Sequence, residues 1–371
     1  MNRWIETEVK TTNMRDKRLN NRLKQILMTL SKDPQKRIPN NCETWSSTQA
    51  TVKRVKDQKV VLVAQDTTFI NLATEDRKKE MGTLVCKNKN EYLLHPSIVF
   101  TPERTNLGLL SHTLWKRPEI NVTDKYHTPF KEKESYRWIA SYKMSCELQK
   151  QHPETVVVNI ADRESDIYEL LLEFEQTKTD EAAEYIIRAK SNRCLLEDGD
   201  ETPHLWETLH GKTSQGTYQI ELARTKYRAA RKATIEVRYD AVSFARGRRK
   251  GGNLPAVTVY AVLAKEINTP VDEAPIERML LTSLPIESLE QAQTVIGWYR
   301  CRWEIEIYFR ALKSGCKVQE LRLESEEGIE KALAVYMIIA WRIHNMTMLA
   351  RELPETPCNQ VLAKKEWQII Y

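Results

Sequence analysis

Two short apolar runs that each lead into an aspartate constrain the fold of this chain more than any other feature. Val60–Ala64 leads into Asp66, and Thr155–Ala161 leads into Asp162. Runs of this length with few polar residues are typical of strands buried on both faces. Such strands need helices on both sides of their sheet, so the sequence predicts an α/β fold.

The pattern over residues 59–193 alternates between strands and helices. After the first run, the predicted elements are strands over Tyr92–Thr101 and Leu107–Leu114, a helix over Lys131–Gln151, the second run, a helix over Ile167–Phe174 and a strand over Tyr185–Ala189. This order is typical of a mixed sheet flanked by helices.

Residues 194–286 break this alternation and are predicted to form an all-β insertion. The predicted strands are Gly216–Ala223, Ala233–Phe244, Val257–Lys265 and Met279–Leu284, several of them with alternating polar and apolar residues. Two long helices follow, over Ser288–Lys313 and from Glu327 to about Arg351.

The changes of pattern give five segments. They are a basic helical head over 1–58, the first part of the α/β core over 59–193, the β insertion over 194–286, the helical end of the core over 287–353 and a tail over 354–371.

Positive charge is concentrated in two blocks. Residues 1–60 hold 14 Lys/Arg and 6 Asp/Glu, and residues 224–250 hold 10 and 2, so each block carries +8 while the whole chain carries +6. Phosphate neutralisation dominates nucleic-acid affinity, so the blocks favour two DNA-binding surfaces. Two solvated charged faces would give the same counts. The candidate contacts are Arg15, Arg18, Arg22, Arg246, Arg248, Arg249 and Lys250.

The remaining composition points to a cytoplasmic protein with no membrane partner. No apolar run approaches the roughly 20 residues that span a bilayer, and the N-terminus has no signal-peptide pattern. The seven cysteines are scattered without a Cys-x-x-Cys pair, which argues against a zinc site and favours reduced thiols.

Four polar residues share one face of the predicted helix Ser288–Lys313. Tyr299, Arg302, Glu306 and Lys313 are 3, 4 and 7 residues apart, which aligns them at about 100° per residue. A carboxylate suits a hard cation, and the phenol and cations suit phosphate oxygens. A salt-bridged amphipathic helix is the alternative. Glu304 lies about 200° from Glu306, so we expect no part for it in the site and a nearly silent effect of Glu304→Gln.

The two strand-end aspartates complete a candidate metal site. Ligands gather at the carboxyl ends of strands in α/β sheets. Asp66 could instead open a turn with Thr67, and Asp162 could precede a helix capped by Ser165 or Asp166. Capping does not explain why Glu306 accompanies Asp66 and Asp162, and three converging carboxylates repel one another unless metal ions neutralise them. We therefore predict that the three side chains converge on one or two divalent ions.

Several segments together resemble one known family. They are Tyr299-x-x-Arg302-Trp303-x-Ile305-Glu306-x6-Lys313, Asp66-Thr67-Thr68, Gly108-Leu109-Leu110 to Trp115-x-Arg117-Pro118, Lys133-Glu134-Ser135-x-x-Trp138, Asp162-Arg163-Glu164-Ser165-Asp166-Ile167 and Arg188-Ala189-Lys190-x-x-Arg193. They are similar to the DDE transposases of bacterial insertion sequences, of the transposon-five type in the insertion-sequence-four group. Two segments of the N-terminal head also resemble this family, namely Asp16-x-Arg18-Leu19 and Ile38-Pro39.

The resemblance implies a fold, a reaction and a set of roles. The core would be RNase H-like, with Asp66, Asp162 and Glu306 as catalytic ligands of Mg²⁺ or Mn²⁺, and two ions are expected. A homodimer would bind the terminal inverted repeats, nick them, form and reopen a hairpin, and join the ends to target DNA. The candidates for DNA or phosphate contact are Tyr299, Arg302, Lys313, Arg278, Arg188, Lys190, Arg193, Arg15, Arg18 and Arg22.

The chain departs from the family pattern in three places. Arg278 stands where the family has a base-stacking Trp, and arginine can also stack on a base. The segment between Ala50 and Lys59 looks shorter than in relatives, and the dimerising domain beyond Pro354 looks missing. An internally deleted and truncated copy is therefore expected.

Two other functions fit parts of the sequence. One is a catalytically inactive DNA-binding fragment that inhibits a full-length transposase. The other is a phosphohydrolase with Asp66 as nucleophile, which ranks last because it needs a second acid where Thr68 stands and leaves the basic blocks unexplained.

Overall fold

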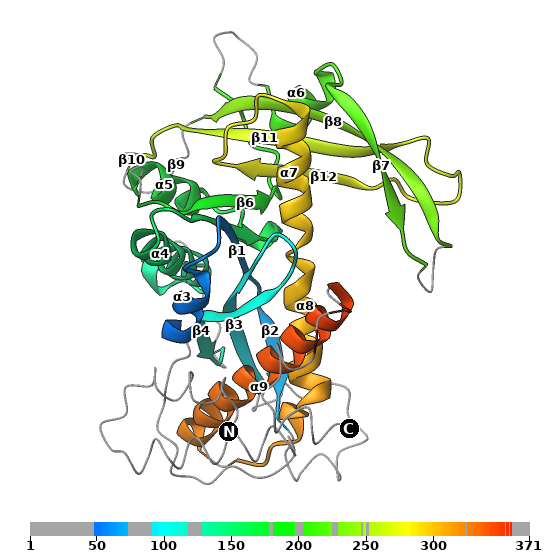
Figure 1. The fold of residues 1–371 in the computed structure, drawn as a ribbon. Helices are drawn as coiled ribbons and strands as arrows, with labels where there is room; N and C mark the ends of the chain where they lie inside the picture. The colour runs from blue at the N-terminus through cyan, green and yellow to red at the C-terminus, as the bar shows by residue number, and fades with distance from the viewer. Residues whose placement is uncertain are drawn as a thin grey trace, which may run out of the picture. The chain divides into compact units, whose positions relative to one another are not determined.

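The structure is a computed structural model of the 371-residue chain. It describes residues 48–72, 91–117, 128–177, 181–196, 203–224, 229–245, 248–249, 252–323, 325–352, 354–355 and 357. The chain forms two compact units, the first from residues 1–137 and 303–371 and the second from residues 138–302. Figure 1 shows their elements, and each unit is described by itself.

The first unit is built around the long strand β3. Its elements in chain order are α3 (Thr48–Val55), β1 (Val60–Gln65), β2 (Thr68–Asn71), β3 (Glu91–Phe100), β4 (Asn106–Trp115), the 3-10 helix Phe130–Glu132, α8 (Trp303–Arg310), the π-helix Ala311–Gly315, the 3-10 helix Val318–Glu320 and α9 (Glu326–Glu352). β1 and β2 pair in succession along one edge of β3, and β4 pairs along the other, all antiparallel. Every residue of β1 after Val60 is buried, as the continuous apolar run predicts.

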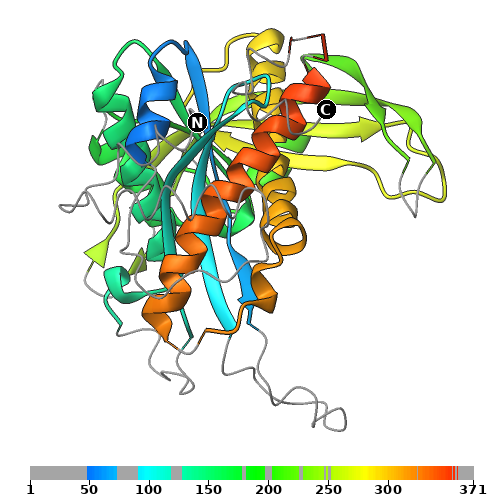
Figure 2. The ribbon, with the colours of Figure 1, turned by 60° about the horizontal axis from the view of Figure 1, so that its bottom comes forward.

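Helix α9 is the longest helix of the first unit and packs against β4 (Figure 2). The Trp341 indole and the Asn345 amide both donate to the backbone carbonyl of Asn106 at 2.9 Å. Gly328–Arg351 is long and apolar enough to cross a membrane, but 72% of its most apolar window is buried. Together with these hydrogen bonds, that burial indicates a core helix.

The second unit has a six-stranded sheet in the order β5-β6-β12-β11-β8-β7. Its elements in chain order are α4 (Tyr136–Gln151, whose first two residues belong to the first unit), β5 (Val156–Ala161), the 3-10 helix Arg163–Ser165, α5 (Tyr168–Thr177), β6 (Glu184–Arg188), α6 (Leu205–Gly211), β7 (Gly216–Leu222), β8 (Arg231–Phe244), β9 (Arg248–Arg249), β10 (Gly252–Asn253), β11 (Val257–Ile267), β12 (Glu277–Thr282) and α7 (Leu289–Arg300). β5 and β6 are parallel and the other neighbours antiparallel. The insertion strands thus continue the sheet that β5 and β6 begin, and α7 packs on β5, β6 and β8.

Most predicted elements are present with bounds shifted by a few residues, but the short strands β2, β9 and β10 were not predicted. The insertion also contains the short helix α6, which the strand pattern did not reveal. The prediction of one helix over Ser288–Lys313 is wrong. A capping box from Ser288 and Gln291 starts α7, but the Cys301 N–H bonds to the Trp298 and Tyr299 carbonyls, so the chain tightens into a turn before α8 begins.

Candidate active site

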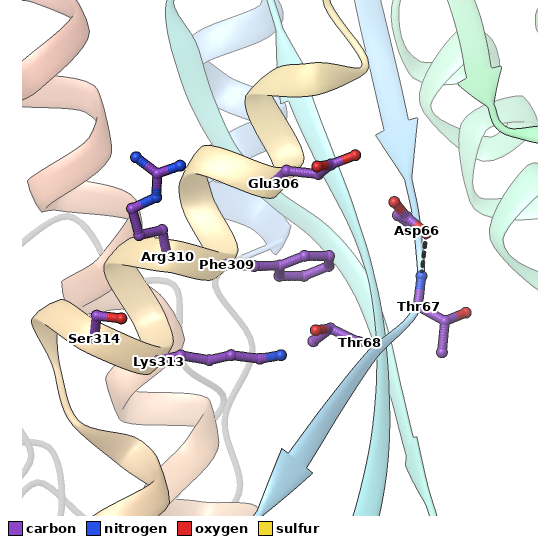
Figure 3. Close-up of a pocket in the computed structure, with 8 residues that line it drawn as sticks. All are labelled: Asp66, Thr67, Thr68, Glu306, Phe309, Arg310, Lys313 and Ser314. Atoms are coloured by element: carbon purple, nitrogen blue, oxygen red, sulfur yellow. Dashed lines mark hydrogen bonds between the residues drawn. The ribbon is translucent and has the colours of Figure 1, made fainter. Parts of the chain in front are cut away.

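One pocket in the first unit contains two of the three predicted catalytic carboxylates. Asp66 and Glu306 both line it, and its volume is about 380 Å³. In Figure 3, Glu306 on α8 and Asp66 after β1 lie on facing sides of the gap between helix and strand. The lining residues are Asp66, Thr67, Thr68, Glu306, Phe309, Arg310, Lys313 and Ser314.

Asp66 lies at an interruption of the strand edge. Asp66 and Thr67 separate β1 from β2 and lie opposite His95 and Pro96 of β3. Proline has no backbone N–H to donate to the ladder, which favours a break at this point. The Thr67 backbone N–H donates instead to the Asp66 carboxylate, with 2.7 Å between N and Oδ1.

Glu306 and Lys313 reach the pocket from a helix whose winding changes between them. α8 ends at Arg310, and Ala311–Gly315 continues as a π-helix. Single π-helical turns are frequent at functional sites. Lys313 is partly buried, and this burial lowers the pKa of its ammonium group from the ordinary value. A cation held partly out of water interacts more strongly with a phosphate oxygen than an exposed one does.

Glu304 faces the interior of the first unit. It is 2% exposed, and its carboxylate oxygens lie 3.6 Å from Arg104 Nη1 and 3.4 Å from His344 Nε2. The structure therefore separates it from the pocket of Glu306, as the helical angle predicts. The nearly silent effect of Glu304→Gln on cleavage stays a prediction, and the burial of Glu304 adds a cost in stability, because its charged partners lose their contact.

Asp162 belongs to the second unit and follows β5. It is the N-cap of the 3-10 helix Arg163–Ser165, and its Oδ1 accepts a hydrogen bond from the Glu164 backbone N–H at 2.8 Å. Asp162 therefore caps this short helix itself, whereas the alternative considered from the sequence placed the cap at Ser165 or Asp166. Asp66 makes a similar contact with the next backbone N–H, so each aspartate is oriented by its own turn.

A cluster of cations surrounds Tyr299 of α7 in the second unit. Burial raises the pKa of the Tyr299 phenol, while the charges of Arg302 and Arg188 act in the opposite direction. Burial and the charge of Arg188 lower the pKa of Arg278. Asp162 belongs to the same electrostatic environment, because its charge also raises the pKa of Tyr299. Five predicted site residues therefore lie near one another in this unit.

Arg193 is engaged inside the second unit. Its Nη2 lies 2.6 Å from Asp166 Oδ1, and its guanidinium is 5.7 Å and 5.6 Å from the ring centroids of Tyr168 and Phe244. Asp166 also accepts the backbone N–H of Lys190 at 2.7 Å. Arg193 thus anchors the loop of the exposed Lys190, and its predicted contact with DNA stays a prediction.

The predicted basic contacts lie largely outside the described residues. Arg15, Arg18 and Arg22 are among residues 1–47, and Arg246 and Lys250 are also outside. Arg248–Arg249 forms β9, which pairs with β10 through the backbone. The DNA-binding roles of both blocks stay predictions.

The first unit offers donors that fit a divalent metal ion. Carboxylate oxygens are the ligands that Mg²⁺ and Mn²⁺ prefer, and Asp66 and Glu306 bring them to one pocket from two elements. Among the described residues, no group of three or more His, Cys, Asp and Glu side chains is arranged to hold a metal. Because Asp162 is in the second unit, the convergence of all three carboxylates stays a prediction.

The residues that support Asp66 were missed by the sequence analysis. Thr67 Oγ1 lies 2.9 Å from His95 Nδ1 and accepts a hydrogen bond from Arg137 Nε at 3.0 Å. These partners are 28 and 70 positions away in the chain. No spacing rule links residues so distant, because only the pairing of β2 with β3 and the fold around it bring them together.

Comparison with known proteins gives two family matches and a distant structural similarity. Residues 1–60 match the transposase DNA-binding family, and residues 160–342 match the transposase DDE domain, which includes Asp162 and Glu306. Among solved structures, the chain is similar to a cryo-EM structure of the piggyBac transposase synaptic complex with hairpin DNA, with 9% identity and a TM-score of 0.37. The alignment covers 79% of this chain and 48% of that one, so the chain spans about half its length.

The predicted fold class is confirmed by these matches and the observed layers. Mixed sheets flanked by helices and a matched DDE domain identify an RNase H-like core. Residues 1–60, which include the predicted DNA-binding head, match the transposase DNA-binding family.

Proposed function

We propose that the chain, whose residues 1–60 and 160–342 match transposase families, is a DDE transposase that binds the ends of a mobile DNA element and cuts them in a metal-dependent reaction. The pocket that contains both Asp66 and Glu306 carries this proposal. Two carboxylates from separate elements, accompanied by a partly buried lysine, suit metal-assisted phosphoryl transfer better than a structural role.

The three carboxylates Asp66, Asp162 and Glu306 would hold one or two Mg²⁺ or Mn²⁺ ions. A bound divalent ion supplies Lewis acidity for the attacking oxygen and charge stabilisation for the leaving oxygen. Lys313 would hold a non-bridging phosphate oxygen beside them. The Tyr299 phenol, which burial keeps protonated to still higher pH by raising its pKa, would donate a hydrogen bond to the DNA backbone.

The steps follow the chemistry of the phosphodiester bond. Water attacks the phosphorus at the element end, the P–O3′ bond breaks, and a 3′-hydroxyl is freed. That hydroxyl attacks a phosphodiester of the opposite strand, and the 3′-oxygen of the flanking DNA leaves, which gives a hairpin. Water hydrolyses the hairpin phosphodiester and restores the 3′-hydroxyl, which then attacks a phosphodiester of the target and displaces a 3′-oxygen of the target strand. A homodimer would hold the two ends, with Arg188, Arg278 and Arg302 on the phosphates.

The test is cleavage of a duplex that carries the terminal repeat flanking the gene. With Mg²⁺ or Mn²⁺ we expect a nick with a 3′-hydroxyl at the repeat boundary, followed by a hairpin, both seen on a denaturing gel. Glu306→Gln should bind the duplex without cutting it. Binding without cleavage by the wild-type chain would favour the inhibitory DNA-binding fragment. Absence of both would overturn the proposal.

A further inference from the structure

A buried hydrogen-bonded chain lies directly behind Asp66 in the first unit. Arg137 Nε donates to Thr67 Oγ1 at 3.0 Å, Thr67 Oγ1 lies 2.9 Å from His95 Nδ1, and His95 Nε2 lies 3.1 Å from Gln65 Oε1. His95 and Gln65 are fully buried. The four residues come from the end of β1, the link to β2, strand β3 and the start of α4.

The direction of every hydrogen bond in this chain is fixed by chemistry. A guanidinium only donates, so the single proton of the Thr67 hydroxyl is available for His95 Nδ1. The Gln65 carbonyl oxygen only accepts, so the His95 proton is on Nε2. The donors therefore run in one order from Arg137 to Gln65.

Thr67 links this chain to the Asp66 carboxylate. Its side chain is held by Arg137 and His95, while its backbone N–H donates to Asp66 Oδ1 at 2.7 Å. Fixing Thr67 therefore fixes both the turn at Asp66 and the orientation of its carboxylate.

We propose that His95 and Arg137, acting through Thr67, are positioning residues that hold the Asp66 carboxylate ready for a divalent cation. The inference rests on the proposed function, because it assigns Asp66 as a metal ligand. Groups behind a metal ligand fix its rotamer, and their loss typically weakens metal affinity by about 10–100-fold.

The decisive variant is Thr67→Val, which keeps the side-chain shape and the backbone N–H but removes the hydroxyl. We expect its affinity for Mn²⁺, titrated on the full-length chain by calorimetry or electron paramagnetic resonance, to fall about 10–100-fold. Thr67→Ser restores the hydroxyl and should recover most of the affinity. His95→Phe, which removes both ring nitrogens, should resemble Thr67→Val.

Ser97→Ala is the matched control for loss of a buried hydroxyl. Ser97 lies two residues after His95 on β3, and its hydroxyl makes no hydrogen bond. The Ser97→Ala variant should bind Mn²⁺ with the affinity of the wild type. Thermal unfolding is measured for every variant. Equal Mn²⁺ affinity in Thr67→Val and wild type would overturn the inference and leave the proposed function intact. A loss of Mn²⁺ affinity in Thr67→Ser or Ser97→Ala as large as that in Thr67→Val would also overturn the inference and leave the proposed function intact. A wild-type chain that neither binds Mn²⁺ nor cleaves DNA would overturn both.

Discussion

The two units carry different parts of the predicted chemistry. In the first unit, Asp66 and Glu306 share a pocket with Lys313. In the second, Asp162 lies in the electrostatic environment of Tyr299 and several arginines. Carboxylates attract cations and arginines attract phosphates, so we propose that the first unit contributes mainly to metal binding and that the second, apart from Asp162, contributes mainly to DNA binding. Substitutions in the first unit should therefore reduce mainly cleavage, and substitutions in the second unit should reduce mainly DNA binding.

The largest expected effect is that of Glu306→Gln in the first unit. The change keeps the side-chain shape but removes a negative metal ligand, so we expect cleavage to fall by on the order of 10³-fold or more while DNA binding persists. Single-turnover cleavage and a DNA-binding titration on the same preparation measure the two quantities.

Glu304→Gln is the matched control, one half-turn away on the same helix. It should retain cleavage per folded molecule but lose about 1–3 kcal/mol of unfolding free energy, because His344 and Arg104 lose a buried charged partner. If Glu304→Gln abolishes cleavage and Glu306→Gln does not, the first unit's pocket is not the metal site.

A smaller effect is expected from the basic residues of the second unit. Arg188→Gln and Lys190→Gln should each reduce the slope of log affinity against log salt by about one, because each removes one phosphate contact. Arg193→Gln should leave the slope nearly unchanged and lower the melting temperature, since its guanidinium is already bound to Asp166. Affinity measured between 50 and 200 mM salt, roughly the range over which such contacts matter, separates the two classes.

An equal loss of slope in Arg193→Gln would make Arg193 a DNA contact after all. An unchanged slope in all three variants would remove the second unit from DNA binding and contradict the division of roles between the units.

The elements that were predictable from the sequence are those whose burial follows one regular pattern along the strand, either continuous or alternating. β1 and β5 are buried on both faces, so their apolar runs revealed both the strands and the aspartates that follow them. β8 is partly buried, and the alternation of polar and apolar residues along it predicted this strand equally well.

The break between α7 and α8 was not predictable, because no proline or glycine marks it. The residues at the turn, Cys301 and Arg302, have ordinary helical character, and the tightening appears only in the hydrogen bonds of Cys301. The support of Asp66 by His95 and Arg137 was hidden for a different reason. It depends on tertiary contacts between distant segments, which a single sequence does not encode locally.

The smallest expected effect, and the sharpest test of Lys313, is a gain in stability. Burial lowers the pKa of Lys313, because the protonated ammonium group costs the folded chain free energy. That cost is fully present below the folded-state pKa and disappears as pH rises to the unfolded value of about 10.4. Lys313→Met should therefore raise the melting temperature slightly at pH 7, and the gain over wild type should shrink as pH approaches 10. Cleavage should fall at the same time, because a phosphate contact is lost. A variant that loses stability at pH 7 would show that Lys313 is a structural residue of the first unit, paired within the fold instead of held for a phosphate.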